Sequence, residues 1–410
     1  MSTTFRAGPS DTFETVARKV YGDERQARRI AQANPGVVEP IPPGTVLTTP
    51  PQPAAPANKR PRAPSDNQNE VALLIDGTRF RFWTDLSITR ALDAMDTVEF
   101  SAPFEAGAPG FRETFRPFSF KDLDVTVGGT PLFTGTLIGV MPVLDAERKT
   151  IGVSGYSRPG VLEDCTAPAS AYPVEFNGLD LQAIAAALCE PFGLGVVFDG
   201  PVGPPFERAA VEPGSTVLSF LSDLAKQRNL VVSSTPDGAL LFQQSVEPGA
   251  PVAVLRQGAS PVLGVTPSFS PQQYFSHITG LQAVRVGTEG SQFTVRNPHL
   301  AGVVRPMTFS APDVEGGSIA DAVQAKTGRM FGNMAAYGVP VSTWRDAQGA
   351  LWAPNTTVLL EAPGAMVYAP YEFVVRSVRF DRSGAQESAE LDLVLPGSFS
   401  GQTPGAMPWD

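Results

Sequence analysis

Residues 8–37, GPSDTFETVARKVYGDERQARRIAQANPGV, decide the fold of the N-terminal part of the chain, because their spacing predicts two short helices. Asp11 and Glu14 stand three residues apart, as in a capping box that satisfies the first free N–H groups of a helix. Asp23 and Gln26 repeat this spacing before a second helix. Each box precedes apolar residues on one helical face: Phe13, Val16, Ala17 and Val20 in the first helix, then Ala27, Ile30 and Ala31 in the second.

The residues on either side of this helix pair predict two strands. Asn34-Pro35 ends the second helix, because a residue that precedes proline disfavours the α region. Pro43-Gly44 then turns the chain into a closing strand, and Thr3–Arg6 is the expected opening strand. The order strand, helix, helix, strand over residues 1–50 resembles a LysM module.

The resemblance to LysM modules implies that two loops carry the binding surface. In this chain the loops 8–13 and 34–41 offer Asp11, Thr12, Asn34 and Ile41. Such loops hold glycan in a secreted LysM module, whereas LysM-like modules of phage tails dock to tail proteins. The same four residues also suit a helix cap, a helix end and a core position. We therefore favour protein docking, or a purely structural role, over glycan binding.

Residues 51–69 predict a linker, because they are rich in proline, alanine and polar residues and show no apolar periodicity. The linker carries Lys59, Arg60 and Arg62. A basic cluster this short is usually a solvated tether, and contact with nucleic acid or an anionic surface is the alternative.

The composition of the 410-residue chain excludes several classes of protein. Forty-one acidic and 31 basic side chains give a formal charge of −10, which argues against a protein that wraps nucleic acid. Cys165 and Cys189 are too few for a disulfide framework, so we favour two buried thiols and folding in a reducing cytoplasm; a single disulfide between them is the alternative. No apolar run approaches the roughly 18 residues of a membrane span, and the polar N-terminus predicts no signal peptide.

The remainder of the chain predicts a β-rich α+β protein, in which 39 glycines and 40 prolines separate many short apolar runs. Turns at Asp76-Gly77 and Gly128-Gly129 divide residues 70–160 into strands of an antiparallel barrel or sandwich. Near the C-terminus, Val374–Phe380 and Ala389–Leu395 predict another pair of strands.

Residues between these β regions mix helices and strands. An apolar stripe over 181–188 predicts one helix, and another stripe behind a Ser215 cap predicts a second. Asp237-Gly238 joins the two strands of a hairpin. A further helix is expected from Ser318, with Asp321 three residues on. The predicted domains are thus 1–50, 70–160, 161–255 (α+β) and 256–396 with a helical insert at 318–334, followed by a tail at 397–410.

The sequence lacks the spacings that catalytic sites require. His277 and His299 are the only histidines, so neither a zincin helix nor a multi-histidine metal site is predicted. The segment around Ser157 resembles a nucleophile elbow, but proline replaces its second glycine, so Ser157 is expected to be structural. Glu163 and Asp164 are expected on an extended segment, where adjacent side chains point apart and cannot flank one bond. We predict no enzyme, cofactor or metal.

Seven segments of the body resemble, in order, the baseplate hub proteins of contractile-tailed phages such as Mu. The resemblance covers most of residues 70–400. The segments are TPLFTGTLIGV, IGVSGYSRPGVLEDCTAP, FNGLDLQAIAAALCEPFGL, VEPGSTVLSFLSDLAKQRNLVVSSTPDGALLF, VVRPMTFSAPD, WRDAQGALWAPNTTVLLEAP and YEFVVRSVRFDRSGAQESAELDLVLPGSF.

This resemblance implies a homotrimer that joins a sixfold tail tube protein to a threefold central spike protein. Each subunit would contribute two tube-like β-barrels, 70–160 and 256–396, with the α+β domain between them. DNA would pass as cargo, without insertion of the protein into a membrane. The expected location is the tail baseplate of a virion assembled in the host cytoplasm, with the N-terminal module docked to another baseplate or tail protein.

Two other functions compete with the hub. One is a peptidoglycan-processing enzyme or cell-wall binding protein anchored by the LysM-like module, which the missing catalytic constellation disfavours. The other is a secreted adhesin, which the missing signal peptide disfavours. The acidic excess suits a passage that repels a polyanion.

Overall fold

The computed structural model describes residues 3–21, 27–49, 68–145, 147, 149–247, 249–281, 291–310 and 319–410. The chain divides into two compact units, Met1–Ser65 and Asp66–Asp410. The predicted Asp23–Gln26 capping box, most of the predicted linker and Ser318 lie outside the described residues. No helix of the described part is long and apolar enough to cross a membrane.

The N-terminal unit contains a strand, two helices and a second strand, in the predicted order. These elements are β1 (Thr3–Arg6), α1 (Phe13–Tyr21), α2 (Ala27–Ala33) and β2 (Val46–Thr49), and β1 pairs with β2 antiparallel. Helix α1 begins later than predicted, because Thr12 and Thr15 form the reciprocal box that was expected of Asp11 and Glu14. Val16, Ala17, Ile30, Ile41 and Leu47 fill the core.

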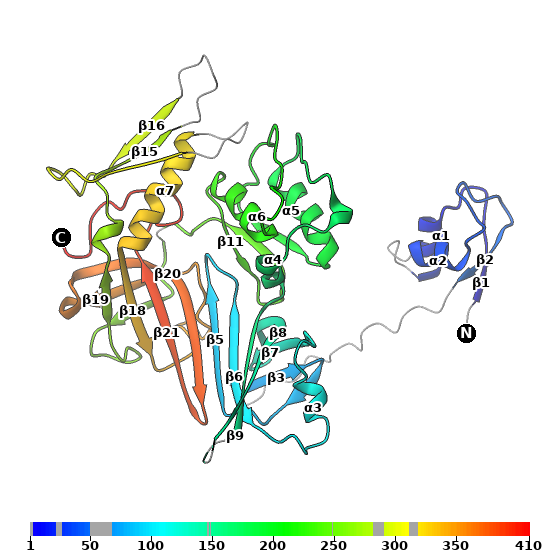
Figure 1. Cartoon of the computed structure of the whole chain (residues 1–410), viewed down its shortest axis with the longest axis horizontal. Helices are drawn as coiled ribbons and strands as arrows, with labels where there is room; N and C mark the ends of the chain where they lie inside the picture. The colour runs from blue at the N-terminus through cyan, green and yellow to red at the C-terminus, as the bar shows by residue number, and fades with distance from the viewer. Residues whose placement is uncertain are drawn as a thin grey trace. The chain divides into compact units, whose positions relative to one another are not determined.

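A 13-stranded sheet organises the larger unit, and the strands of the first predicted barrel form one half of it (Figure 1). A short helix, α3 (Phe111–Thr114), follows the fourth of these seven strands along the chain. The strands of this half are β3 (Val71–Ile75), β4 (Thr78–Phe80), β5 (Asp85–Ala91), β6 (Thr97–Pro103), β7 (Asp122–Val127), β8 (Thr130–Leu144) and β9 (Lys149–Ser157).

The other half of the sheet comes from the second predicted barrel. Its strands are β13 (Ala253–Arg256), β14 (Thr266–Phe269), β18 (Ala335–Val341), β19 (Thr357–Ala362), β20 (Val367–Ser383) and β21 (Gln386–Val394). All neighbours in the 13-stranded sheet are antiparallel except β13 and β19, which are parallel. Strand β20 pairs with β5, so the two halves are not separate barrels within the chain but share one sheet.

The two halves of the sheet have the same strand order and differ in direction at one matched pair, since β3 is antiparallel to β7 whereas β13 is parallel to β19. The first has the spatial order β3-β7-β8-β9-β6-β5 and the second β13-β19-β20-β21-β18-β14. Matching these orders strand by strand also preserves the order along the chain, from β3 and β13 to β9 and β21. A bulge falls at the matched place in each half, between Leu137 and Gly139 of β8 and between Val375 and Ser377 of β20.

An α+β region joins the halves and has a core of its own. It contains α4 (Val161–Asp164), α5 (Leu181–Cys189), β10 (Val196–Asp199), α6 (Val217–Lys226), β11 (Val231–Ser234) and β12 (Leu240–Gln243). The predicted helices and hairpin are present, and β10 adds to the hairpin in parallel with β12. Thr216, rather than the predicted Ser215, caps α6 by accepting a hydrogen bond from the Ser219 N–H.

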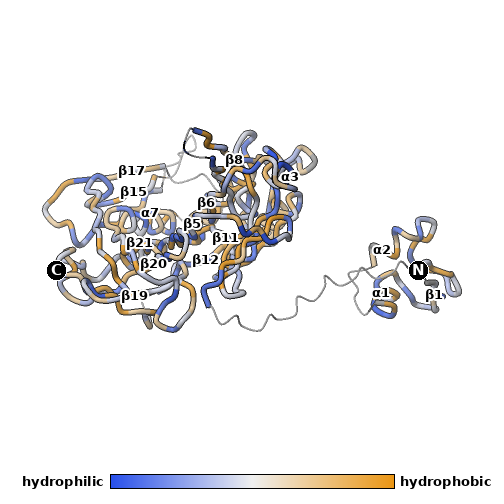
Figure 2. The backbone as a smooth tube through the Cα atoms, turned by 90° about the horizontal axis from the view of Figure 1, so that it is seen from below, coloured by the Kyte–Doolittle hydropathy of each residue, from blue (hydrophilic) through white to orange (hydrophobic). Residues whose placement is uncertain are grey.

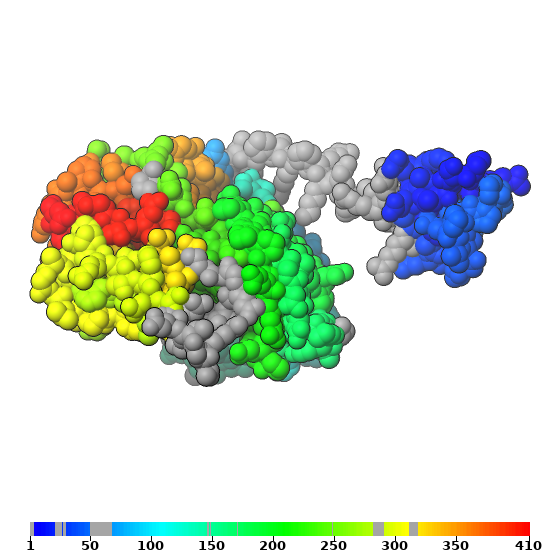
Figure 3. All heavy atoms as spheres, turned by 90° about the horizontal axis from the view of Figure 1, so that it is seen from above, coloured from blue at the N-terminus to red at the C-terminus, as the bar shows by residue number. Residues whose placement is uncertain are grey.

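A small lobe is inserted between β14 and β18. It pairs β15 (His277–Leu281) with β16 (Gln292–Arg296) and β17 (Pro306–Ser310), and helix α7 (Ile319–Met334) packs against this sheet. The irregular C-terminal tail crosses α7, and Figure 3 shows it (red) beside the lobe (yellow). His299 Nε2 lies 2.6 Å from the Pro404 carbonyl oxygen, which ties the tail to the lobe.

Candidate functional site: the polar face of the sheet

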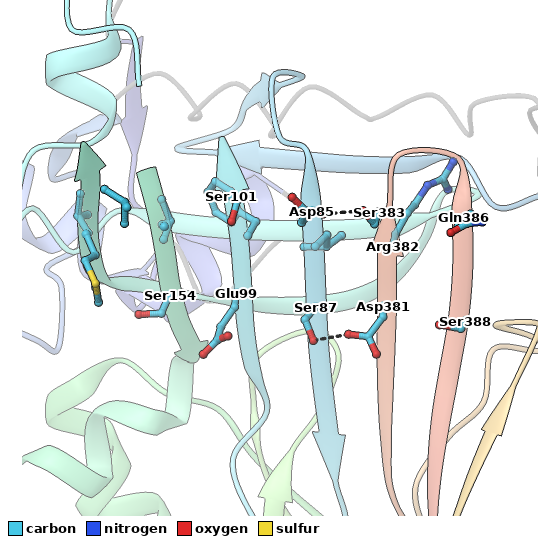
Figure 4. Close-up of a pocket in the computed structure, with 18 residues that line it drawn as sticks. Asp85, Ser87, Glu99, Ser101, Ser154, Asp381, Arg382, Ser383, Gln386 and Ser388 are labelled. Atoms are coloured by element: carbon cyan, nitrogen blue, oxygen red, sulfur yellow. Dashed lines mark hydrogen bonds between the residues drawn. The ribbon is translucent and has the colours of Figure 1, made fainter. Parts of the chain in front are cut away.

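Side chains on one side of the sheet form polar rows that run across five strands, β9, β6, β5, β20 and β21. Cross-strand pairing aligns one row, Ser154, Glu99, Ser87, Asp381 and Ser388. The next row consists of Gly152, Ser101, Asp85, Ser383 and Gln386. Figure 4 shows both rows on the same side of the strands. We call this surface the polar face.

Strand alternation produces the polar face, because successive side chains point to opposite sides of a sheet. Along β5, Leu86 and Ile88 are buried in the core, whereas Asp85 and Ser87 lie on the other side. Apolar and polar segments accordingly succeed one another along the strands in Figure 2. A shallow hollow of about 740 Å³ lies over the polar face and is bounded by Met141 and Val143 of β8.

Carboxylates outnumber cations around this hollow. Asp85, Glu99 and Asp381 line it, together with a single cationic side chain, that of Arg382. The Arg382 guanidinium donates a hydrogen bond to the Asn69 carbonyl oxygen at 2.8 Å. Hydroxyls hold two of the carboxylates: Ser87 Oγ donates to Asp381 at 2.8 Å and Ser383 Oγ donates to Asp85 at 2.6 Å.

A further row contains a cation that is neutralised by its neighbours. Arg379 lies between Thr89 of β5 and Glu390 of β21. Its guanidinium is 2.9 Å from Asp381 and 2.8 Å from Glu390. The hydrogen bond to Asp381 is the main cause that raises the pKa of Arg379. Glu390 balances the charge of Arg379 within this row, and Asp381 of the first row also contacts the guanidinium, so Arg379 adds no uncompensated positive charge to the polar face.

Hydrogen bonds favour the ionised form of one carboxyl group on the polar face, that of Asp85. Ser383 first, and Thr84 second, donate to Asp85 and lower the pKa of its carboxyl group. The described residues contain no group of three or more side chains placed to hold a metal ion. The face therefore presents fixed negative charge and hydroxyls, an arrangement that repels a polyanion and binds it weakly.

The residues considered for catalysis lie elsewhere. His277 is on β15, where Nδ1 lies 2.8 Å from Ser276 Oγ, and His299 contacts the C-terminal tail. Ser157 is fully buried at the end of β9. Glu163 and Asp164 were expected on an extended segment, but they lie in α4, where Asp164 accepts a hydrogen bond from the Tyr156 hydroxyl at 3.0 Å.

The predicted docking residues of the N-terminal unit are engaged within that unit. The Asp11 carboxylate accepts hydrogen bonds from the Gly8 N–H and from Lys19, and the Lys19 bond is the main cause that lowers the pKa of Asp11. Asn34 bonds to the backbone of Thr48 at 2.8 and 2.9 Å, and Ile41 is buried. Thr12 caps α1.

A contact between the two loops of this unit was missed by sequence reasoning. Glu39 Oε1 accepts a hydrogen bond from the Phe13 N–H at 2.5 Å, which joins the loop after α2 to the start of α1. An acidic residue beside a helix N-terminus is a common signal, but these two residues are 26 positions apart. The polar rows were likewise missed, although the alternation within β5 and β20 is visible in the sequence.

Residues 159–244 match a family described as "Baseplate hub protein gp44-like, second domain". The chain is 24% identical over 314 residues to baseplate hub protein gp44 of Escherichia phage Mu, a match that covers 72% of this chain and 79% of that protein.

Two solved structures have a similar fold. The 43 kDa tail protein of prophage MuSo2 from Shewanella oneidensis is 27% identical, with a TM-score of 0.69 over 80% of this chain and 99% of the other. The tail protein from Neisseria meningitidis MC58 is 20% identical, with a TM-score of 0.68 over 81% and 98%. These matches confirm the predicted resemblance to the baseplate hub proteins of Mu-type phages.

Proposed function

We propose that this protein is a structural baseplate hub of a contractile phage tail or a tail-derived particle, and that three copies form a ring between the tail tube and the central spike. The observation that carries this proposal is the repeated strand order of the two halves of the sheet. Each half resembles one tube subunit, so three chains supply six similar units. Such a ring matches a sixfold partner on one side and a threefold partner on the other.

The polar face supplies the lining of the passage through this ring. Its rows carry Asp85, Glu99 and Asp381, and Arg379 is neutralised by two carboxylates. Cations on the wall would bind the phosphates of a moving nucleic acid and slow it, whereas carboxylates and hydroxyls leave it free to slide. DNA is therefore a passing cargo rather than a bound ligand.

The location and partners follow from the relatives. The comparisons with baseplate hub proteins support the predicted place in the tail baseplate of a virion. The partners of this chain are other tail and baseplate proteins, among them the tube and spike proteins. No relative described above is named as an enzyme, and the protein has no catalytic role of its own.

The N-terminal unit docks the hub to a further tail protein. The order of its elements supports the LysM-like interpretation. The loops that would face glycan are joined by the hydrogen bond between Glu39 and the Phe13 N–H, and Asp11, Asn34 and Ile41 are engaged internally. These contacts favour protein docking over wall binding.

The native mass of the purified chain tests the ring. Light scattering is expected to report about three times the chain mass, alone or with the spike protein added. A stable dimer or tetramer, or a chain that stays monomeric in the presence of its spike, would refute the proposal.

A further inference from the structure

The two halves of the sheet meet within the chain at one well-defined junction. Residues Asp85–Ala91 of β5 pair antiparallel with Ser377–Ser383 of β20, and Ser87 lies opposite Asp381. The part of β20 that pairs with β5 begins directly after the bulge at Val375/Ser377.

At the two ends of this strand order, the segments that correspond to the junction each have one edge that pairs with no described strand. Strand β8 continues after its own bulge, from Gly139 to Leu144, and of the described strands only β9 pairs with this part. Strand β14 pairs with β18 and with no other described strand. By topology β14 corresponds to β5 and β8 corresponds to β20, so the chain has both partners of a second junction, but at opposite ends of its sheet.

Matched bulges fix the register of this second junction. The first pair after the bulge is Gly139 with Ser154 in one half and Ser377 with Asp392 in the other, so Gly139 corresponds to Ser377. Four residues further along each strand, Val143 corresponds to Asp381. Following the pairs inward from Ser154 and Asp392 makes Thr266 the counterpart of Ser87.

We propose that β14 of one chain pairs antiparallel with residues 139–144 of β8 in a second copy, with Thr266 opposite Val143. This inference rests on the proposed ring and specifies how its subunits join. The eight strands from β8 to β14 alternate in direction, so the next β8 arrives antiparallel to β14, as the pairing requires. The contact is head to tail and closes a ring.

Apolar side chains at the two open edges complement one another in this register. Phe269, which is 42% exposed in the single chain, falls opposite Val140, and Val265 falls opposite Leu144, which is 57% exposed. Met141 and Val143, 67% and 43% exposed, continue the row on the polar face. Pairing would bury part of each exposed surface, which favours association.

Two prolines limit the backbone contribution to the junction. Pro267 of β14 falls opposite Pro142 of β8, and neither has an N–H group to donate. The junction between chains therefore depends more on side chains than the internal one does. Proline on an open edge also hinders uncontrolled pairing of strands before assembly.

Disulfide trapping in the full chain tests the register. Thr266→Cys combined with Val143→Cys is expected to give a covalent trimer on non-reducing gels after mild oxidation, because facing residues on antiparallel strands are within reach of a disulfide. Mixing the two single variants should give covalent dimers and no trimer, since each chain then has one reactive end. Ser87→Cys with Asp381→Cys is the internal control and should close within one chain.

The offset pair Val143→Cys with Ser268→Cys separates this register from its neighbours, because diagonal positions lie too far apart for an unstrained disulfide. Suppose that the wild-type protein is a trimer, but that only the offset double variant forms a covalent trimer or that neither double variant does. The proposed junction is then wrong, and the ring itself is not contradicted. A chain that stays monomeric at every concentration, with its spike protein present, would overturn both. In the wild-type protein, assembly should slow amide exchange in 139–144 and 264–269, and unchanged exchange in a trimer would also contradict the pairing.

Discussion

Replacing Gly328 with alanine tests the packing of the C-terminal tail on α7. Gly328 is buried in the helix, and a Cβ added there would lie 2.8 Å from the Gly397 carbonyl oxygen and 2.9 Å from the Gly401 Cα. Both obstacles are backbone atoms of the tail, so the helix and the tail cannot keep their present separation. The tail must move, which disturbs the burial of Phe399 and Met407.

The sign of the change in unfolding free energy distinguishes the steric effect of the tail from the effect of helix propensity. In an unobstructed helix, Gly→Ala stabilises by about 1 kcal/mol. Forcing an extra carbon into a packed contact costs about 1–3 kcal/mol, and partial exposure of the two tail side chains adds to this loss. We therefore expect a net loss of roughly 1–2 kcal/mol of unfolding free energy.

Thermal or urea unfolding of the full chain measures the change. Gly405→Ala is the matched control, because a Cβ at this tail position meets nothing within 4 Å and should alter stability by less than about 0.5 kcal/mol. Limited proteolysis should also remove the tail faster in the Gly328→Ala variant. A midpoint equal to or above that of the wild type would refute the close approach of the tail to α7.

Four other outcomes are expected. Burial raises the pKa of Asp96, which is paired with Arg90, from 3.8 to about 6; the stability that this group contributes below pH 3.8 is therefore lost as pH rises to about 6, and unfolding of Asp96→Asn should show less loss of stability over this range. Deletion of residues 1–65 should leave the native mass of the body unchanged apart from the deleted residues, and a change in subunit number would contradict independent docking. Zymography on peptidoglycan should give no clearing band, and a band lost on mutating one carboxylate would establish an enzyme. Glu99→Lys should increase DNA retention in gel shifts at low salt relative to Glu99→Gln, and equal retention would argue against a charge effect of the polar face.

Local signals in the sequence predicted the elements whose partners are close along the chain. The helical stripe of α7 and the hairpin of β11 and β12 were found because apolar periodicity and an Asp-Gly turn suffice to define them. The caps of α1 and α6 were each displaced by one residue, because adjacent residues able to cap compete and the final packing selects between them.

Long-range pairing was beyond the reach of local signals. Strands β5 and β20 are almost 300 positions apart, and the sequence of neither strand identifies the other as its partner. The same holds for the parallel pairing of β13 with β19, whose residues are about 100 positions apart. Glu163 and Asp164 were placed on an extended segment because a four-residue helix is too short to show periodicity.

The insertions in the sheet interrupt its two halves at different places. The α+β region follows β9 at the end of the first half, whereas the lobe with α7 separates β14 from β18 inside the second. In the proposed ring, each insertion therefore recurs at every second unit, while the strands themselves recur at every unit. A neighbour that touches only strand ends meets six nearly equivalent positions, and one that touches only the insertions meets three. In the proposed ring, a single polypeptide would therefore present both sixfold and threefold contact positions.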